Sequence, residues 1–328
     1  MSADDDRRLG VERLLFLRSL TNARPSGPEA VQIAGAMRDL YFKRDQRLFA
    51  IGDPAIDVFF IVKGSVRLTA PDAAPWDFEA PAVIGAIDAF AGRPRTRRAV
   101  ATADTHALAL AHTDWLAVLE EHFDFARESV LRLADGLGRM RLGLAGDGGH
   151  PGPSEPAGPR AAGLGLYEKT VALRRLPVLR AAGVQVTMRL AALAEERALA
   201  PGEALFREGD AGETLDAVAG GRIAIERATP PLRAAFGAGS LVGGLASLAA
   251  PRAAFDARAA ETSLVLRLRK DDVFDVMEDH FELTRSILAS VNEERSALMA
   301  RHGTLDGGAA PEAAPGAGTR LGGPGAYP

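Results

Sequence analysis

The clearest indication of the fold is the segment Val58-Phe59-Phe60-Ile61-Val62-Lys63-Gly64-Ser65-Val66-Arg67-Leu68. Two runs within it, 58–62 and 65–68, are rich in β-branched and aromatic residues, which is typical of strands. Gly64 lies between them and can adopt the backbone angles of a tight turn, so the stretch predicts a β-hairpin. Similar short runs separated by Gly and Pro occur along the chain, and together they favour a small antiparallel barrel or jelly roll.

The pattern around this hairpin occurs twice. The second copy of the hairpin is expected at 215–226, with Gly220-Gly221 at its turn. Three landmarks recur in the same order, at offsets of 157 or 158 residues: 47–53 at 204–210, 63–64 at 220–221, and 120–123 at 278–281. Self-similarity over this length predicts a tandem duplication, with two units of the same fold.

A helix is expected at the start of each unit, before the strands. In the first unit, apolar residues at Leu14, Leu15, Leu17, Leu20, Ile33, Met37 and Leu40 recur at helical spacing. The spacing changes to short strand-like runs after this segment. The first unit is therefore predicted to begin with a helix and to continue with a barrel.

A longer helix is expected at the end of each unit. In the first unit it is predicted over 114–141, with Asp114 as its N-cap and an apolar seam that repeats every seven residues. The equivalent helix of the second unit begins at Asp272, and Thr284 and Arg295 interrupt its seam. Such a seam either packs against the barrel of its own unit or pairs two chains. We keep both alternatives, the second being a homodimer through the first of these helices.

Composition divides the 328 residues into four parts. We expect folded domains at 9–142 and 164–302, which are similar in length. Residues 143–163 are rich in Gly, Pro and Ala, which predicts a linker, and residues 303–328 have the same composition, which predicts a disordered tail.

Overall composition excludes several kinds of chemistry. The chain has no cysteine, which excludes disulfides, thiolate metal sites and cysteine nucleophiles. Apolar residues make up 47% of the chain, enough to form real cores, and the net charge of −4 does not favour nucleic acid or anionic membranes. The N-terminus has no signal pattern and no apolar run reaches the length of a membrane span, so we expect a cytoplasmic protein.

Each unit resembles a cyclic nucleotide-binding domain, the helix–jelly-roll–helix module of bacterial catabolite activators and protein kinase A regulatory subunits. The resemblance is carried by the Leu48-Phe49-x-x-Gly52-Asp53 turn and by the 59–68 strands, in order and with a second copy. It implies a mainly β fold with flanking helices, present twice. It also implies a ligand, cAMP or another cyclic nucleotide, and a regulatory role in signal transduction.

The family binds its ligand in a phosphate-binding cassette, which reads Gly-Glu, a short apolar helix, Pro-Arg and a small residue. A helix N-terminus and an arginine fork suit a phosphate group. The second cassette is one residue shorter before Pro-Arg. By this resemblance the arginines contact the phosphate, and the cassette residues are Gly85, Ala86, Ile87, Arg95 and Thr96 in the first unit and Gly243, Gly244, Leu245, Arg252 and Ala253 in the second.

Both cassettes lack the family's glutamate, which hydrogen-bonds the ribose 2′-hydroxyl. Ala86 and Gly244 stand in its place. A hydrogen bond to a charged group contributes about 1.5–3 kcal/mol, so affinity is expected to fall roughly 10- to 150-fold. Asp88 also introduces a carboxylate into the first cassette. Because the first cassette has the full family length, we expect it to be the better site.

Two functions are compatible with these residues. The first is a non-enzymatic sensor that binds a cyclic nucleotide or related phosphate ligand weakly or atypically and signals through contacts with a protein partner. The second is an interaction or scaffold protein that keeps the fold and has lost the ligand. Catalytic motifs, paired metal-ligand residues and a helix-turn-helix are not found, so we expect no catalytic activity, no metal or cofactor and no DNA-binding domain.

Overall fold

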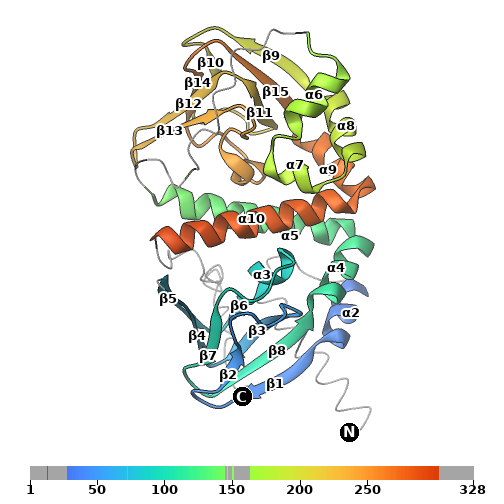
Figure 1. The fold of residues 1–328 in the computed structure, drawn as a ribbon, viewed down its shortest axis with the longest axis vertical. Coiled ribbons are helices and arrows are strands. Elements are labelled where there is room, and N and C mark those ends of the chain that lie inside the picture. Colours follow the sequence, from blue (N-terminus) through green and yellow to red (C-terminus); the bar gives the residue numbers. More distant parts are fainter. Residues whose placement is uncertain are drawn as a thin grey trace, which may run out of the picture.

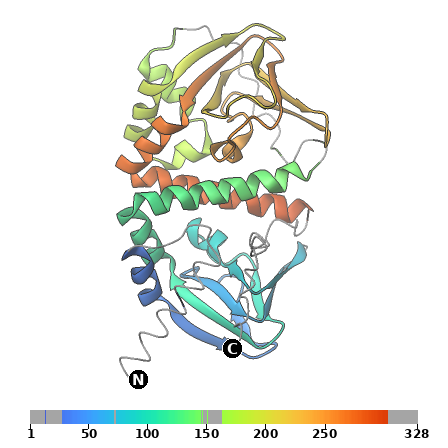
Figure 2. The same ribbon diagram turned by 180° about the vertical axis from the view of Figure 1, so that it is seen from behind.

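The computed structural model describes residues 13, 28–71, 73–144, 146, 150 and 163–302. Two barrel units lie at opposite ends of the molecule, and two long helices lie side by side between them (Figures 1 and 2). The predicted duplication is therefore confirmed as two copies of one fold. The expectations for Leu14 to Leu20, for most of the linker and for the tail lie outside the described residues.

Antiparallel sheets form the first barrel. Within residues 28–144 the strand orders are β1-β8-β3-β6 and β2-β7-β4-β5. The strands are β1 (Arg38–Phe42), β2 (Arg47–Phe49), β3 (Asp57–Lys63), β4 (Ser65–Ala70), β5 (Ala73–Glu79), β6 (Ala82–Ile84), β7 (Arg98–Ala101) and β8 (Thr105–Ala111).

The second barrel repeats this plan. In its described residues the strand orders are β10-β14-β12-β13 and β11-β15-β9. The strands are β9 (Glu195–Leu199), β10 (Ala204–Phe206), β11 (Thr214–Gly220), β12 (Arg222–Arg227), β13 (Leu232–Gly237), β14 (Asp256–Ala259) and β15 (Ser263–Arg269).

The strands at 58–62 and 65–68 form as predicted, but the hairpin prediction is wrong. β3 pairs with β8 and β6, whereas β4 pairs with β5 and β7 in the other sheet. Gly64 is a corner between sheets, with φ of +91°, and a Cβ atom there would lie 2.5 Å from the carbonyl oxygen of Asp104. Glycine is needed because another part of the backbone passes so close. Gly221 makes the same corner between β11 and β12, with φ of +76°.

Helices flank each barrel. They are α2 (Pro28–Ala36), α3 (Ala86–Phe90), α4 (His112–Glu121), α5 (Phe123–Leu142), α6 (Leu166–Leu173), α7 (Pro177–Ala181), α8 (Val184–Leu193), the 3₁₀ helix η1 (Gly244–Leu248), α9 (Lys270–Asp279) and α10 (Phe281–His302). The opening helix ends earlier than predicted, because Leu40 belongs to β1 and pairs with β8.

The closing helix of each unit is two helices rather than one. The chain leaves helical geometry at His122, with φ of −125° and ψ of 83°, and at His280, with φ of −137° and ψ of 85°. The repeated Glu-x-His-Phe landmark is therefore the bend between the two helices. The predicted N-caps are also wrong, since Asp114 and Asp272 lie in the first turn, after the caps.

The apolar seams of α5 and α10 pack against each other within one chain. Val130 and Leu137 of α5 and Val291 of α10 are all fully buried. Thr284 is also fully buried, so it does not interrupt the second seam as we expected. A homodimer through the same face of α5 would require these helices to separate. Each long helix also reaches across the molecule, because α5 contacts η1 and α10 contacts α3 (Figure 1).

Candidate functional site

In the first cassette, the arginine points into the protein. The Arg95 side chain lies under the Phe49 ring, 4.4 Å from the ring centroid, and only 3% of the residue is exposed. It donates hydrogen bonds to the carbonyl oxygens of Gly85, at 2.6 Å, and Asp57. Burial lowers the pKa of Arg95, although nearby carboxylates oppose this shift. This guanidinium holds the cassette together and faces backbone oxygens rather than solvent.

The carboxylate of Asp88 closes the first cassette. It accepts hydrogen bonds from the backbone N–H and the hydroxyl of Thr96, each at 3.0 Å, and from Nε of Arg93 at 2.9 Å. Asp88 is 7% exposed. A backbone N–H, a hydroxyl and a guanidinium are groups that would also suit a phosphate oxygen. A carboxylate of the chain itself therefore satisfies the anion-binding donors of this cassette.

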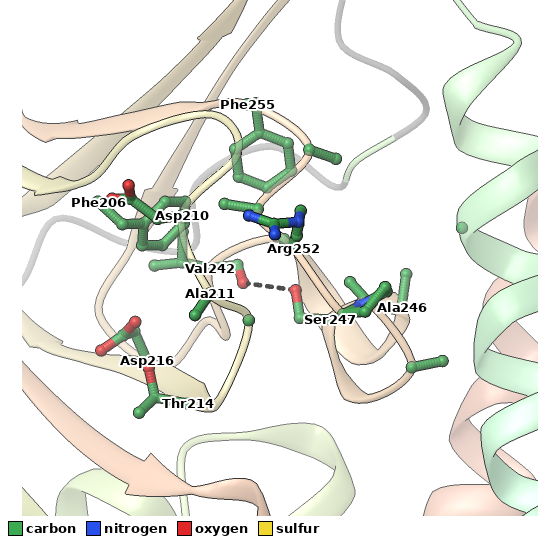
Figure 3. Close-up of a pocket in the computed structure, with 18 of the residues that line it drawn as sticks. Phe206, Asp210, Ala211, Thr214, Asp216, Val242, Ala246, Ser247, Arg252 and Phe255 are labelled. Atoms are coloured by element: carbon green, nitrogen blue, oxygen red, sulfur yellow. Dashed lines mark hydrogen bonds between the residues drawn. The ribbon is translucent and has the colours of Figure 1, made fainter.

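The second cassette opens onto a cavity of about 640 Å³. It lies between the barrel of the second unit and α5 of the first, and its lining includes Gly243, Ser247, Arg252 and Ala253 of the cassette. In Figure 3, Arg252 lies beneath the ring of Phe255, with Phe206 and Asp210 to one side. A cavity of this size falls within the usual range for small-ligand sites.

Arg252 differs from Arg95 in its exposure. It is exposed in the cavity and donates a hydrogen bond to the carbonyl oxygen of Gly209 at 2.8 Å. The position beside the first cassette glycine is filled differently here. A Cβ atom on Gly243 would meet the Ser247 hydroxyl and, at 2.9 Å, the Phe255 ring, whereas a Cβ atom on Gly85 would meet Arg95 at 2.8 Å. Ser247 and Phe255 thus pack beside the second cassette glycine, where the arginine packs in the first unit, and Arg252 faces the cavity.

Arg141 of α5 covers the position where the glutamate is missing. Gly244 has φ of +68°, and a Cβ atom there would lie 2.6 Å from Nη1 of Arg141. The Arg141 guanidinium donates to the carbonyl oxygen of Gly243 at 3.2 Å and pairs with Glu294 of α10 at 2.7 Å. Burial raises the pKa of Glu294, while the charge of Arg141 opposes this shift. The first unit therefore contributes a buried cation to the second cassette.

Two further titratable side chains line the cavity. His150 is 4% exposed, and its ring makes edge contacts with Phe236 and Phe255. Burial, with the charges of Arg141 and Arg227, lowers the pKa of His150 to about 3. Burial also lowers the pKa of Lys270 to about 8, and its ammonium group donates to the carbonyl oxygen of Ala250 at 2.7 Å.

The structure brings together some of the residues that the sequence singled out. Gly85 contacts Arg95 directly, whereas Thr96 bonds to Asp88. In the second unit, Gly243, Arg252 and Ala253 share one cavity. Leu245 is instead buried in the core, and Gly244 is covered by Arg141. The two cassette arginines differ in exposure, because Arg252 of the shorter cassette faces the cavity whereas Arg95 of the full-length cassette is buried.

Sequence reasoning missed Arg141, His150, Arg227, Arg267 and Lys270, all of which line the cavity. None of them lies in a cassette. His150 comes from the segment predicted as a linker, where Gly146 also hydrogen-bonds to Pro231 and Arg233. The position of Arg141, at the end of an apolar helix seam, could have drawn attention to this residue. It could not have indicated its partners, Gly243 and Glu294.

Metal sites and membrane-spanning helices are both absent from the described residues. No group of three or more His, Cys, Asp or Glu side chains in that part of the chain could hold a metal ion. Across the same residues, none of the helices has both the length and the apolar character needed to cross a membrane.

The sequence model of the cyclic nucleotide-binding domain family matches the chain twice, at residues 39–122 and 196–280. Together the matches span more than half of the chain, and each includes a barrel with its cassette. No curated protein matches the sequence.

Several solved structures share low similarity with the chain. The regulatory domain of Toxoplasma gondii PKA with cAMP is 14% identical, and the match covers 90% of this chain and 97% of that one, with a TM-score of 0.32. The regulatory subunit of a cAMP-independent protein kinase A from Trypanosoma cruzi, bound to guanosine, is 17% identical over 86% and 92%, with a TM-score of 0.33. The N-terminal domain of a Streptomyces coelicolor A3(2) transcriptional regulator is 27% identical over 38% and 93%, with a TM-score of 0.35. At these TM-scores the likenesses carry no functional argument.

Proposed function

The chain belongs to the cyclic nucleotide-binding domain family, and from this premise we propose that it is a non-enzymatic regulatory protein that senses a nucleotide phosphate through its second domain. The cavity at the second cassette is the observation that carries this proposal. It offers an exposed arginine, Arg252, next to the aromatic rings of Phe206 and Phe255. A guanidinium binds phosphate and aromatic rings stack on a base, so these groups suit a nucleotide.

The first domain has a structural role in this proposal. Its cassette donors are already bonded to Asp88, and Arg95 is buried against Phe49. An incoming phosphate would have to displace a carboxylate that makes several charge-assisted hydrogen bonds. We therefore assign ligand binding to Gly243, Arg252 and Ala253 rather than to the first cassette.

Helix α5 provides the route by which binding reaches the rest of the molecule. It forms one wall of the cavity and also packs along α10, which contacts the first cassette. A ligand shifts a conformational equilibrium only if it binds one arrangement better than another. Because the cavity wall belongs to the other domain, ligand affinity depends on how the domains are packed. A protein partner in the cytoplasm would bind one arrangement of the domains better than the other and so respond to the ligand.

Calorimetry of the full chain tests the proposal. We expect weak binding of cAMP and cGMP by the unmodified protein and loss of binding in Arg252→Ala, since the phosphate loses its guanidinium. Arg233→Ala is the matched control, because this arginine is on the same barrel but 87% exposed at its side chain and outside the cavity. Equal binding by both variants would contradict the proposal.

A scaffold without a ligand is the second candidate function. It is favoured by the Asp88 carboxylate, which satisfies the first cassette from within. The same experiment separates the two. If cyclic nucleotides and dinucleotides fail to bind up to millimolar concentration, the fold serves protein contacts alone.

A further inference from the structure

We propose that the ligand of the second-domain cavity carries two phosphate groups, as a dinucleotide or a nucleoside bisphosphate does. This inference rests on the proposed function, and concerns which nucleotide the same cavity selects. It follows from the charge of the cavity lining. Among the described residues, the charged side chains of the lining are the cations Arg139, Arg141, Arg197, Arg227, Arg252, Arg267 and Lys270 and the acids Asp135, Asp210, Glu213 and Asp216.

Some of these charges compensate one another. Arg267 pairs with Asp216 at 2.8 Å, and Arg139 pairs with Asp135 at 2.6 Å. Arg141 pairs with Glu294. Within the described residues the lining has seven cations and four acids, and these pairs involve two of the acids, Asp135 and Asp216.

Other cations of the lining bond to the backbone instead. Arg252 donates to Gly209, at 2.8 Å, and Arg227 donates to the carbonyl oxygens of Pro230, at 3.1 Å, and Leu142, at 3.4 Å. Within the described part of the chain, neither of these arginines forms an ion pair. A carbonyl oxygen orients a guanidinium but does not neutralise it. An anionic ligand is therefore the natural counter-charge.

The two arginines belong to different walls of the cavity. Arg252 follows η1 and lies beside Phe255 (Figure 3), whereas Arg227 ends β12 and bonds to the last residue of α5. The Arg227 wall also includes Arg141, and both charges lower the pKa of His150, which contacts Phe255. One phosphate at Arg252 would leave Arg227 with backbone carbonyl oxygens as its hydrogen-bond partners and no anion from the ligand. A second phosphate would satisfy Arg227 with further charge-assisted hydrogen bonds.

Cavity size and shape agree with such a ligand. The volume of about 640 Å³ lies in the middle of the range for small-ligand sites. Phe206, Phe255 and His150 place aromatic rings along the lining, and these suit stacking on the base of such a ligand. Inorganic phosphate alone would pair with the arginines but would have no base to stack on the aromatic rings.

Calorimetry of the full chain tests the inference with cAMP, adenosine 3′,5′-bisphosphate, cyclic di-AMP and cyclic di-GMP. We expect at least one ligand with two phosphates to bind about tenfold or more tightly than cAMP, with the difference shrinking as salt rises. Arg227→Gln should remove this preference, so that ligands with two phosphates bind no more tightly than cAMP does. Arg139→Gln is the matched control, because it removes the same charge from a half-exposed position on α5.

The outcomes separate this inference from the proposed function. If ligands bind and require Arg252 but cAMP binds as tightly as those with two phosphates, the inference is wrong and the proposed function stands. The same conclusion follows if Arg139→Gln and Arg227→Gln weaken binding of the two-phosphate ligands equally. The net positive charge of the cavity would then explain the preference without a specific contact from Arg227. If none of the four ligands binds, both are wrong. Should Arg227→Gln fail to fold, the double variant Arg141→Gln/Glu294→Gln tests the same wall without leaving a buried charge.

Discussion

Replacement of His150 by Phe should remove an acid sensitivity from the second domain. The imidazole is 4% exposed and contacts Phe236 and Phe255, so a phenyl ring suits the site. Its Nδ1 has no hydrogen-bond partner among the described residues. Protonation would place a charge in this buried position, next to Arg141 and Arg227. The folded protein therefore favours neutral His150.

The magnitude follows from proton linkage. Burial lowers the pKa of His150 to about 3, from 6.5 for an ordinary histidine. Between these values the unfolded chain binds the proton and the folded chain does not, so acid favours unfolding. The stability contribution is present above pH 6.5 and is lost as pH falls. It amounts to about 2 kcal/mol between pH 7 and pH 5.

Urea denaturation of the unmodified protein and of His150→Phe at pH 7, 6 and 5 measures this effect. The titratable groups that both proteins share cancel when their free energies of unfolding are subtracted. The unmodified protein should lose about 2 kcal/mol more than His150→Phe over this range. His112→Gln, at the start of α4, is the control substitution of another histidine. If His150→Phe keeps the full acid sensitivity, the histidine is not buried in its neutral form and the reasoning fails.

Three further predictions concern the packing. Asp88→Ala should lower the stability of the first domain by about 2 kcal/mol in thermal unfolding, because the hydrogen bonds from Thr96 and Arg93 to this buried carboxylate are lost; unchanged stability would mean that the carboxylate does not close the cassette. Leu137→Glu should lower the free energy of unfolding by at least about 3 kcal/mol rather than release a stable monomer, because the side chain is fully buried in the core. A variant that unfolds with the free energy of the unmodified protein and sediments as a folded monomer in the ultracentrifuge would contradict the helix pairing. Lys270→Gln should remove a rise of stability between pH 8 and 10.5, because burial lowers the pKa of Lys270 to about 8 from 10.5 and the unfolded chain binds the proton in this range; denaturation at pH 8 and 10 that shows the same rise in both proteins would refute it.

Much of the fold could be predicted from the sequence because its signals are local. The strands at 58–62 and 65–68 follow from residue type, and the duplication follows from landmarks that recur in order. Their pairing could not be predicted in the same way. Gly64 is compatible with both a hairpin turn and a corner between sheets, and the choice depends on Asp104, which is forty residues away.

The sequence predicted part of the candidate site, because motif spacing is also a local signal. Motif spacing predicted both cassettes and their arginines, Arg95 and Arg252. Whether each arginine faces a cavity or the core depends on its neighbours in space, Phe49 in the first domain and Phe255 in the second. Cassette length carries no information about these neighbours.

By itself the sequence determined that this chain has two copies of one barrel, each with a cassette and a long apolar helix. Only the tertiary structure decided that α5 crosses to the second cassette, where Arg141 covers Gly244 and pairs with Glu294. The physical reason is the range of each signal. Strand propensity, turn residues and seam periodicity act over a few neighbouring residues. The charge of Arg141 reaches the second cassette from a segment 102 residues away from Gly243, and only the packing of α5 against η1 brings the two together.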